Sequence, residues 1–241
     1  MRYEAVLFDL DDTLYPYEPA ATAGRTAAFE RARTLGYEFD RETFETVYET
    51  GRREAKREVP AGAASHDRFA YFKRGLEEYT GEPRPGDAHA LGEAYWDEFC
   101  ETMAPFAELR PTLSALASAG TAVAVTTNLQ TRTQLRKLSA LGVGDAVDAL
   151  VTSEEVGRDK PGSAMFTLPL ARVDCRVGDA VVVGDNPAAD VAGANALGID
   201  TVLFDHAHAH GDGDAVDETL PETQHPDHYV DSFAAVREVV A

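Results

Sequence analysis

Short apolar runs that end abruptly at polar residues recur along the chain. The clearest runs are 4–8, 121–125, 180–183 and 201–204, and 148–153 is a weaker one. Runs of this length are typical of strands that are buried on both faces of a sheet. Helical patterns lie between them, such as 131–141, where Leu135, Leu138 and Leu141 share one side. This alternation predicts an α/β fold with a doubly wound parallel sheet covered by helices on both faces.

One long stretch interrupts the alternation, because residues 17–100 contain no convincing strand. Apolar side chains recur there at helical spacing in four segments, 20–35, 44–55, 69–79 and 91–99. Asp40 is a plausible N-cap of the second segment. The pattern predicts a four-helix domain, 17–100, inserted into a core domain made of 1–16 and 101–241. Because the insert follows the first strand directly, we expect it to act as a cap over a site at the strand ends.

The composition is that of a folded and strongly acidic protein. Hydrophobic residues make up 44% of the chain, which is enough for a sizeable core. The 42 acidic residues face 22 basic ones, and the net charge is −20. Nucleic acid is excluded as a partner, because phosphate backbones bind cationic patches. Any site for a small anionic substrate must therefore be locally cationic.

The same composition bears on where the protein works. Apolar runs such as 180–183 are too short to cross a bilayer, and the N-terminus reads as a buried strand rather than a signal peptide. We therefore expect a cytoplasmic protein with no membrane partner. The acidic surface, poor in lysine, resembles that of proteins from extreme halophiles, because high salt screens the repulsion between like charges. We expect a cytoplasm of high salt.

The polar residues best suited to catalysis all lie where a predicted strand ends or in the loop after it. In chain order they are Asp9, Asp11, Thr127, Asn128, Lys160, Asp185 and Asp190. Because the carboxyl ends of parallel strands meet at one edge of a sheet, we expect these side chains to converge. The four carboxylates would raise one another's pKa values unless a cation compensated for them, and Lys160 supplies only one positive charge. An oxygen-lined site of this kind suits Mg²⁺.

The arrangement resembles the haloacid dehalogenase superfamily of phosphatases along essentially the whole chain. The first motif of that family, Asp-x-Asp-x-Thr after a hydrophobic strand, is matched by Asp9, Asp11 and Thr13. The second motif, a Thr or Ser that closes a strand, is matched by Thr127. The resemblance implies a core with a Rossmann-like sheet and a helical cap inserted after the first motif.

The two remaining motifs lie in the second half of the chain. The third, a Lys commonly followed by Pro, is matched by Lys160 and Pro161. The fourth, Gly-Asp followed by four residues and a further Asp, is matched by Gly184, Asp185 and Asp190. All four motifs occur in the family's order, so that the resemblance does not depend on any one of them.

Three places depart from the common family pattern, and one of them is Arg110-Pro111, which replaces the more usual Pro-Gly type of turn before the next helix. Asp12 stands where many members carry Gly, and we expect little effect from this change. Pro169 falls within 165–173, which is a helix in relatives. We expect it to kink or shorten that helix, because proline lacks the backbone N–H.

The resemblance implies a role for each matched residue. Asp9 attacks phosphorus and becomes an aspartyl phosphate, and Asp11 protonates the leaving oxygen and later deprotonates the hydrolytic water. Thr127, Asn128 and Lys160 bind the substrate phosphate, and Lys160 also neutralises charge on Asp9.

The resemblance also implies the ligands of the metal. Mg²⁺ is held by Asp9, by the backbone carbonyl of Asp11 and by Asp185. Asp190 orients Lys160 or a metal-bound water. These four aspartates are the set expected to surround the ion.

Asp11 distinguishes between two chemistries of the family. Members that cleave carbon–halogen bonds lack an acid two residues after the nucleophile, because a halide leaves without a proton whereas an alkoxide needs one. The sequence therefore favours a phosphatase for a small phosphorylated metabolite. A phosphomutase shares every core motif and stays an alternative. A non-catalytic regulatory relative is disfavoured, because no catalytic carboxylate is missing.

The tail from 205 to 228 is rich in histidine and acidic residues. Its histidines are His206, His208, His210, His225 and His228. Histidines at such density suggest a zinc site, but the acidic, turn-rich setting favours a solvated surface loop. A short strand near Tyr229 and a helix from Ser232 are expected to follow.

Overall fold

The computed structural model describes residues 3–59, 62–205 and 220–240, and the chain divides into two compact units. The sheet unit comprises Met1–Pro16 and Ala104–Ala241, and the helical unit comprises Tyr17–Met103. The chain thus returns to the sheet unit after residue 103, whereas the sequence predicted residue 100. The reason is that the last helix of the insert continues to Thr102. In the described ranges, no helix is both long and apolar enough to span a membrane.

The sheet unit is built on six parallel strands. They are β1 Ala5–Phe8, β2 Ala122–Thr127, β3 Ala149–Thr152, β4 Ala180–Gly184, β5 Asp200–Phe204 and β6 His228–Val230. Their order is β3-β2-β1-β4-β5-β6, and every neighbouring pair is parallel. The α/β class and the doubly wound parallel sheet are therefore confirmed. The order reverses between β1 and β4, which is where such sheets bind ligands.

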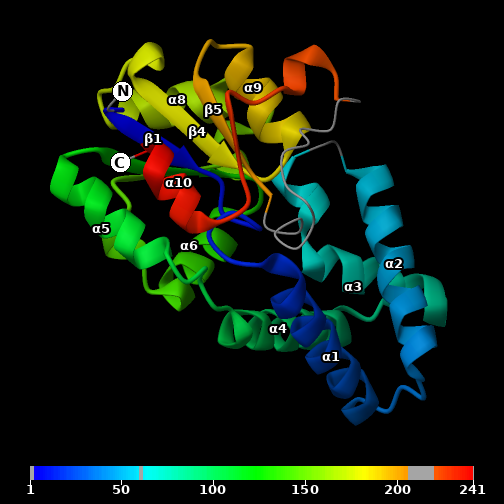
Figure 1. Cartoon of the computed structure of the whole chain (residues 1–241). Helices are drawn as coiled ribbons and strands as arrows, with labels where there is room; N and C mark the ends of the chain where they lie inside the picture. The colour runs from blue at the N-terminus through cyan, green and yellow to red at the C-terminus, as the bar shows by residue number, and fades with distance from the viewer. Residues whose placement is uncertain (1–2, 60–61, 206–219, 241) are drawn as a thin grey trace. The chain divides into compact units, whose positions relative to one another are not determined.

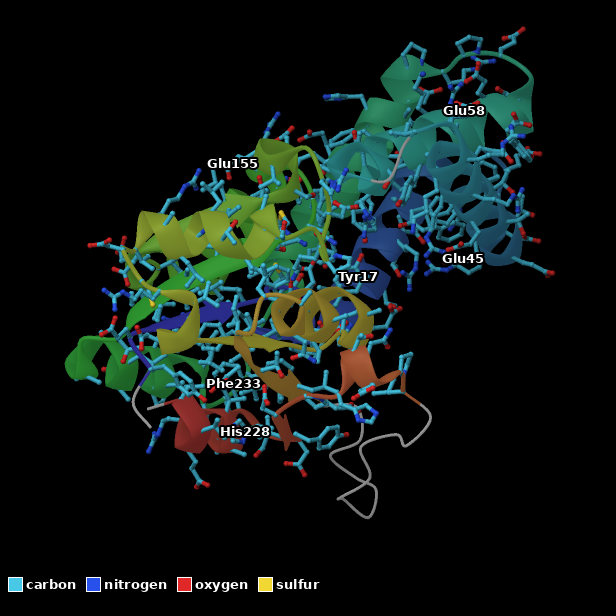
Figure 2. All side chains as sticks on the ribbon, turned by 90° about the horizontal axis from the view of Figure 1, so that it is seen from above. Tyr17, Glu45, Glu58, Glu155, His228 and Phe233 are labelled. Carbon is cyan, nitrogen blue, oxygen red and sulfur yellow. The ribbon has the colours of Figure 1, made fainter. Side chains whose placement is uncertain are left out.

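Helices cover both faces of this sheet (Figure 2). They are α5 Leu109–Ala119, α6 Thr131–Leu141, α7 Ser153–Val156, α8 Ala164–Arg172, α9 Ala192–Asn195 and α10 Phe233–Val240. Successive residues of β1 point to opposite faces. Leu7 belongs to a buried core with Phe166 of α8, whereas the ring of Phe8 stacks on Phe233 of α10 with centroids 6.1 Å apart. Helices α8 and α10 accordingly lie on opposite sides of the sheet.

Helix α8 accommodates Pro169 without becoming shorter than the predicted nine-residue segment. Proline has no N–H and therefore leaves the carbonyl of Met165, four residues earlier, without its helical donor. The hydroxyl of Thr126 in β2 donates to this carbonyl at 2.5 Å. Of the two predicted effects, kinking or shortening, shortening does not occur, because a neighbouring strand satisfies the buried acceptor.

The helical unit consists of two helix pairs, α1 beside α4 and α2 beside α3 (Figure 1). The helices are α1 Tyr17–Thr34, α2 Arg41–Glu58, α3 Arg68–Thr80 and α4 Pro85–Thr102. Asp40 caps α2 and accepts a hydrogen bond from the backbone N–H of Thr43 at 2.7 Å. Glycine allows α2 and α3 to touch, because a Cβ on Gly51 would lie 1.9 Å from the carbonyl oxygen of Tyr71.

Candidate active site

Four of the predicted residues meet at the carboxyl ends of β1 and β4. Carboxylate oxygens of Asp9, Asp185 and Asp190 lie within 4.8 Å of one another. The ammonium group of Lys160 donates to Oδ1 of Asp9 and to Oδ1 of Asp190, the latter at 2.6 Å. We call these four residues the Asp9 cluster. The reversal of strand order between β1 and β4 brings them together, although Asp9 and Asp190 lie far apart in the chain.

Asp9, Asp190 and Lys160 are buried and Asp185 is half-buried, and this burial perturbs the ionisation of the cluster. Desolvation and the neighbouring carboxylates raise the pKa of Asp9 to about 7, although Lys160 opposes the change. Burial and the charges of Asp9 and Asp190 raise the pKa of Asp185 to about 8. Burial lowers the pKa of Lys160, but the two aspartates it contacts raise it above its ordinary value. Asp9 and Asp185 therefore hold protons near neutral pH that a bound cation would displace.

The end of β4 is shaped to admit Asp190. A Cβ on Gly184 would lie 2.3 Å from Cγ of Asp190, so that only glycine leaves the carboxylate its place. Asp190 lies in a π-helical turn, Pro187–Val191, which precedes α9. The backbone N–H of Asn186 donates to its Oδ2 at 3.1 Å. This turn directs Asp190 back toward the strand end.

Thr127 and Asn128 connect the end of β2 to the Lys160 loop. The backbone N–H of Lys160 donates to Oδ1 of Asn128 at 3.0 Å. The buried hydroxyl of Thr127 accepts a hydrogen bond from Nε2 of Gln134 at 2.6 Å. Gln134 has no exposed surface and was not among the predicted residues. It holds Thr127 in a fixed position at the strand end.

The carboxylate of Asp11 lies outside the group of oxygens formed by Asp9, Asp185 and Asp190. Lys137, which is fully buried, donates to Oδ1 of Asp11 at 2.7 Å and to Oδ2 at 2.8 Å. The hydroxyl of Tyr15 also donates to Oδ1. The sequence predicted no role for Lys137. The available signal was the scarcity of lysine, since the chain contains only four.

Asp12 takes the left-handed backbone conformation, with a φ of 59°. Glycine is the usual residue in this conformation, and aspartate is one of the few others that tolerate it. The turn after β1 can therefore form with Asp12 where many relatives carry Gly. Its charge also raises the pKa of Asp185.

The charges of the site match a divalent cation. Because Lys137 contacts Asp11 rather than the Asp9 cluster, the cluster holds three carboxylates and the single positive charge of Lys160. Two further positive charges would balance it. Carboxylate oxygens are the ligands that Mg²⁺ prefers, so that the residues present fit this ion.

The histidine-rich tail is described only in part. His206, His208 and His210 lie outside the described residues. His225 and His228 are exposed, and Nε2 of His225 lies 3.0 Å from the carbonyl oxygen of Leu220. Within the described ranges, the carboxylates of the Asp9 cluster form the one group able to hold a metal ion.

Comparison with known proteins identifies the family. The profile of the haloacid dehalogenase-like hydrolases matches residues 3–198. Ribulose-1,5-bisphosphate 5-phosphatase of Halopiger xanaduensis is 52% identical over 237 residues, which cover 98% of this chain and 99% of that protein. Glyceraldehyde 3-phosphate phosphatase of Methanopyrus kandleri is 34% identical over 200 residues, 83% of this chain and 82% of that protein.

A solved structure supports the same fold. The HAD-hydrolase YfnB from Bacillus subtilis, bound to magnesium, superposes with a TM-score of 0.71 at 20% identity. The match covers 100% of this chain and 99% of that one. The chain therefore belongs to the haloacid dehalogenase-like hydrolases, and it is a phosphatase that acts on phosphoric monoesters.

Proposed function

We propose that this phosphatase cleaves its substrate in two steps through an aspartyl phosphate on Asp9, with Asp11 as general acid and base and Mg²⁺ as cofactor. One observation carries the proposal. Lys160 bridges Asp9 and Asp190 beside Asp185, at the point where the strand order of the sheet reverses. This is the position at which sheets of this kind bind and transform ligands.

In the first step Asp9 acts as the nucleophile. Lys160 donates to Oδ1 of Asp9, which leaves Oδ2 free to attack phosphorus. The new bond forms as the bond from phosphorus to the ester oxygen breaks, and Asp11 gives that oxygen a proton. Thr127, Asn128 and Lys160 stabilise the phosphoryl oxygens through hydrogen bonds and charge.

In the second step water replaces Asp9. Asp11, now ionised, takes a proton from the water as its oxygen attacks phosphorus. The bond between phosphorus and Asp9 breaks, inorganic phosphate leaves, and both carboxyl groups return to their starting states. Lys137 and Tyr15 hold Asp11 by its oxygens and so define the place from which the proton moves.

Asp9, Asp185 and the backbone carbonyl of Asp11 would hold Mg²⁺, and Asp190 would orient Lys160. When bound, the ion supplies positive charge to the phosphoryl oxygens and to the crowded carboxylates. The three carboxylates of the Asp9 cluster support this assignment, because they offer oxygen ligands and because two further positive charges would balance them.

The substrate we propose is a sugar phosphate with two phosphate groups, of which one is hydrolysed. The 52% identity to ribulose-1,5-bisphosphate 5-phosphatase along nearly all of both chains supports this choice. The helical unit, inserted directly after the first motif, would act as the cap that excludes bulk water. The excess of 42 acidic over 22 basic residues supports a cytoplasm of high salt as the working environment.

The decisive test is Asp9→Asn, assayed by phosphate release in molar potassium chloride with magnesium. The variant should fall to background, because the amide is not a nucleophile. Asp145→Asn, at an exposed aspartate of the same unit, is the matched control and should keep wild-type turnover. Unchanged turnover of Asp9→Asn would contradict the proposed mechanism. Chelation of the metal should abolish turnover reversibly.

A further inference from the structure

Gln134 of α6 is a fully buried polar residue that lies against the end of β2. Its side-chain nitrogen, Nε2, is 2.6 Å from Oγ1 of Thr127 and 2.6 Å from the backbone carbonyl oxygen of Asn128. A carbonyl oxygen can only accept a hydrogen bond, so that the atom facing it must be the nitrogen of the amide. Because a primary amide has two N–H groups, Gln134 donates one of them to each oxygen.

The oxygen of the same amide takes no part in this contact. Among the residues that the structure describes, none donates a hydrogen bond to Oε1 of Gln134, although this atom is buried. A buried acceptor without a donor lowers stability, and an apolar side chain of similar size would avoid this cost. The presence of a glutamine at this position is therefore explained by its two N–H donors.

The hydroxyl of Thr127 has one proton to donate. It donates this proton to the carbonyl oxygen of Asn128 at 3.2 Å, which is longer than usual for an O–H donor. The same carbonyl already accepts an N–H of Gln134 at the much shorter distance of 2.6 Å. The proton of Thr127 is therefore weakly bound, and a stronger acceptor at the end of β2 would take it.

The turn that follows Thr127 has an unfavourable backbone conformation. Leu129 has a φ of 105°, in a region that residues other than glycine rarely adopt. Its backbone N–H donates to the buried hydroxyl of Ser153 at 3.0 Å. Backbone strain persists only where the surroundings impose it, and it is concentrated at functional sites. The bond to Ser153 stabilises the turn in which the carbonyl oxygen of Asn128 faces Gln134.

We propose that Gln134 is a positioning residue of the phosphatase, which directs the proton of the Thr127 hydroxyl toward a phosphoryl oxygen of the substrate. The inference rests on the proposed function, which places Thr127 beside the phosphoryl group. One N–H of Gln134 holds the hydroxyl oxygen, and the other occupies the carbonyl of Asn128, which competes for the proton. A donor oriented in advance stabilises the charge that gathers on the phosphoryl oxygens in the transition state.

The test is a double-mutant cycle on the hydrolysis of p-nitrophenyl phosphate, in molar potassium chloride with magnesium. Thr127→Val removes the hydroxyl but keeps the branched shape, and it should lower kcat by about a hundredfold. Gln134→Met should lower kcat by about tenfold and change KM little, because the oriented bond strengthens in the transition state. Since Gln134 acts through the hydroxyl, the double variant should be no slower than Thr127→Val alone.

Leu135→Met, at the exposed neighbouring position of α6, is the matched control and should keep the wild-type kcat. Losses that multiply to about a thousandfold in the double variant would mean that Gln134 acts independently of the hydroxyl, and they overturn the inference. An unchanged kcat in Gln134→Met or in Thr127→Val overturns it as well. Circular dichroism checks the fold, and Gln134→Leu replaces Gln134→Met if the latter does not fold. Failure of the proposed function looks different, because Asp9→Asn would then keep its turnover.

Discussion

The ammonium group of Lys137 binds both carboxylate oxygens of Asp11, at 2.7 and 2.8 Å, and has no exposed surface. The pair ties α6 to the turn that follows β1. It also separates Asp11 from the other three aspartates, whose oxygens lie together. Lys137 is accordingly a positioning residue for the proton that the leaving oxygen needs, and it does not have to touch the substrate.

Lys137→Met should therefore slow esters with poor leaving groups selectively. An alkyl phosphate needs a proton on its leaving oxygen, and a misplaced general acid should lower its kcat by about a hundredfold. p-Nitrophenol leaves readily as an anion, so that p-nitrophenyl phosphate should lose much less. Lys73→Met, at an exposed lysine, is the control and should change neither rate. Equal losses on both esters would contradict a positioning role.

Magnesium should stabilise the protein more strongly as the pH rises. The pKa values of Asp9 and Asp185 are raised to about 7 and about 8, so that from about pH 4 upward the native state holds protons that the unfolded state has lost. Without metal, stability should fall through this window by up to about 1.4 kcal/mol per pH unit for each proton.

Since Mg²⁺ binds the ionised carboxylates, its effect on the melting temperature should be larger at about pH 8 than at about pH 5.5. Thermal unfolding with and without magnesium at both pH values measures this difference. Asp185→Asn should lose most of the gain. A gain independent of pH would mean that the ion binds elsewhere.

Gly184→Ala should damage the site without changing any charge. The added Cβ would lie 2.3 Å from Cγ of Asp190, so that the carboxylate must move. We expect a loss of about 1–3 kcal/mol in stability together with a large fall in kcat. Gly178→Ala is the control, because its Cβ meets nothing within 4 Å. Wild-type activity in Gly184→Ala would show that the position of Asp190 does not matter.

Potassium chloride should raise the melting temperature. With a net charge of −20 the folded chain repels itself, and the Debye length falls from about 10 Å at 0.1 M salt to about 3 Å at 1 M. Most of the gain should therefore come below about 1 M. Melting curves by circular dichroism across a salt series measure it, and a flat series would exclude charge repulsion as a major term.

The sheet and its site could be predicted for a common physical reason. Strands buried on both faces leave uninterrupted apolar runs, and parallel pairing brings their carboxyl ends to one edge. Asp9 and Asp185 each follow such a run, so that their convergence required no further information. The N-cap of α2 by Asp40 could also be predicted, because helix capping depends on local sequence.

The buried face of α6 could not be predicted from the pattern of apolar residues. Hydrophobicity alone groups Leu135 with Leu138 and Leu141, yet Leu135 is 55% exposed. Gln134 and Lys137 complete the buried face instead, at the same helical spacing. Both are polar and find their partners at the ends of other strands. The hydrophobic pattern of one helix does not show which distant residues its polar side chains will contact.

The insertion of the helical unit between β1 and the rest of the sheet unit also affects how the protein folds. Ala5 pairs with Ala122 on one side and with Ala180 on the other, so that β1 leaves the ribosome long before either neighbour exists. The helical unit, by contrast, is one continuous stretch of chain and makes its contacts over shorter sequence separations. During synthesis the helical unit can fold first. The apolar strand β1 then stays unpaired, a state in which a nascent chain is prone to aggregate.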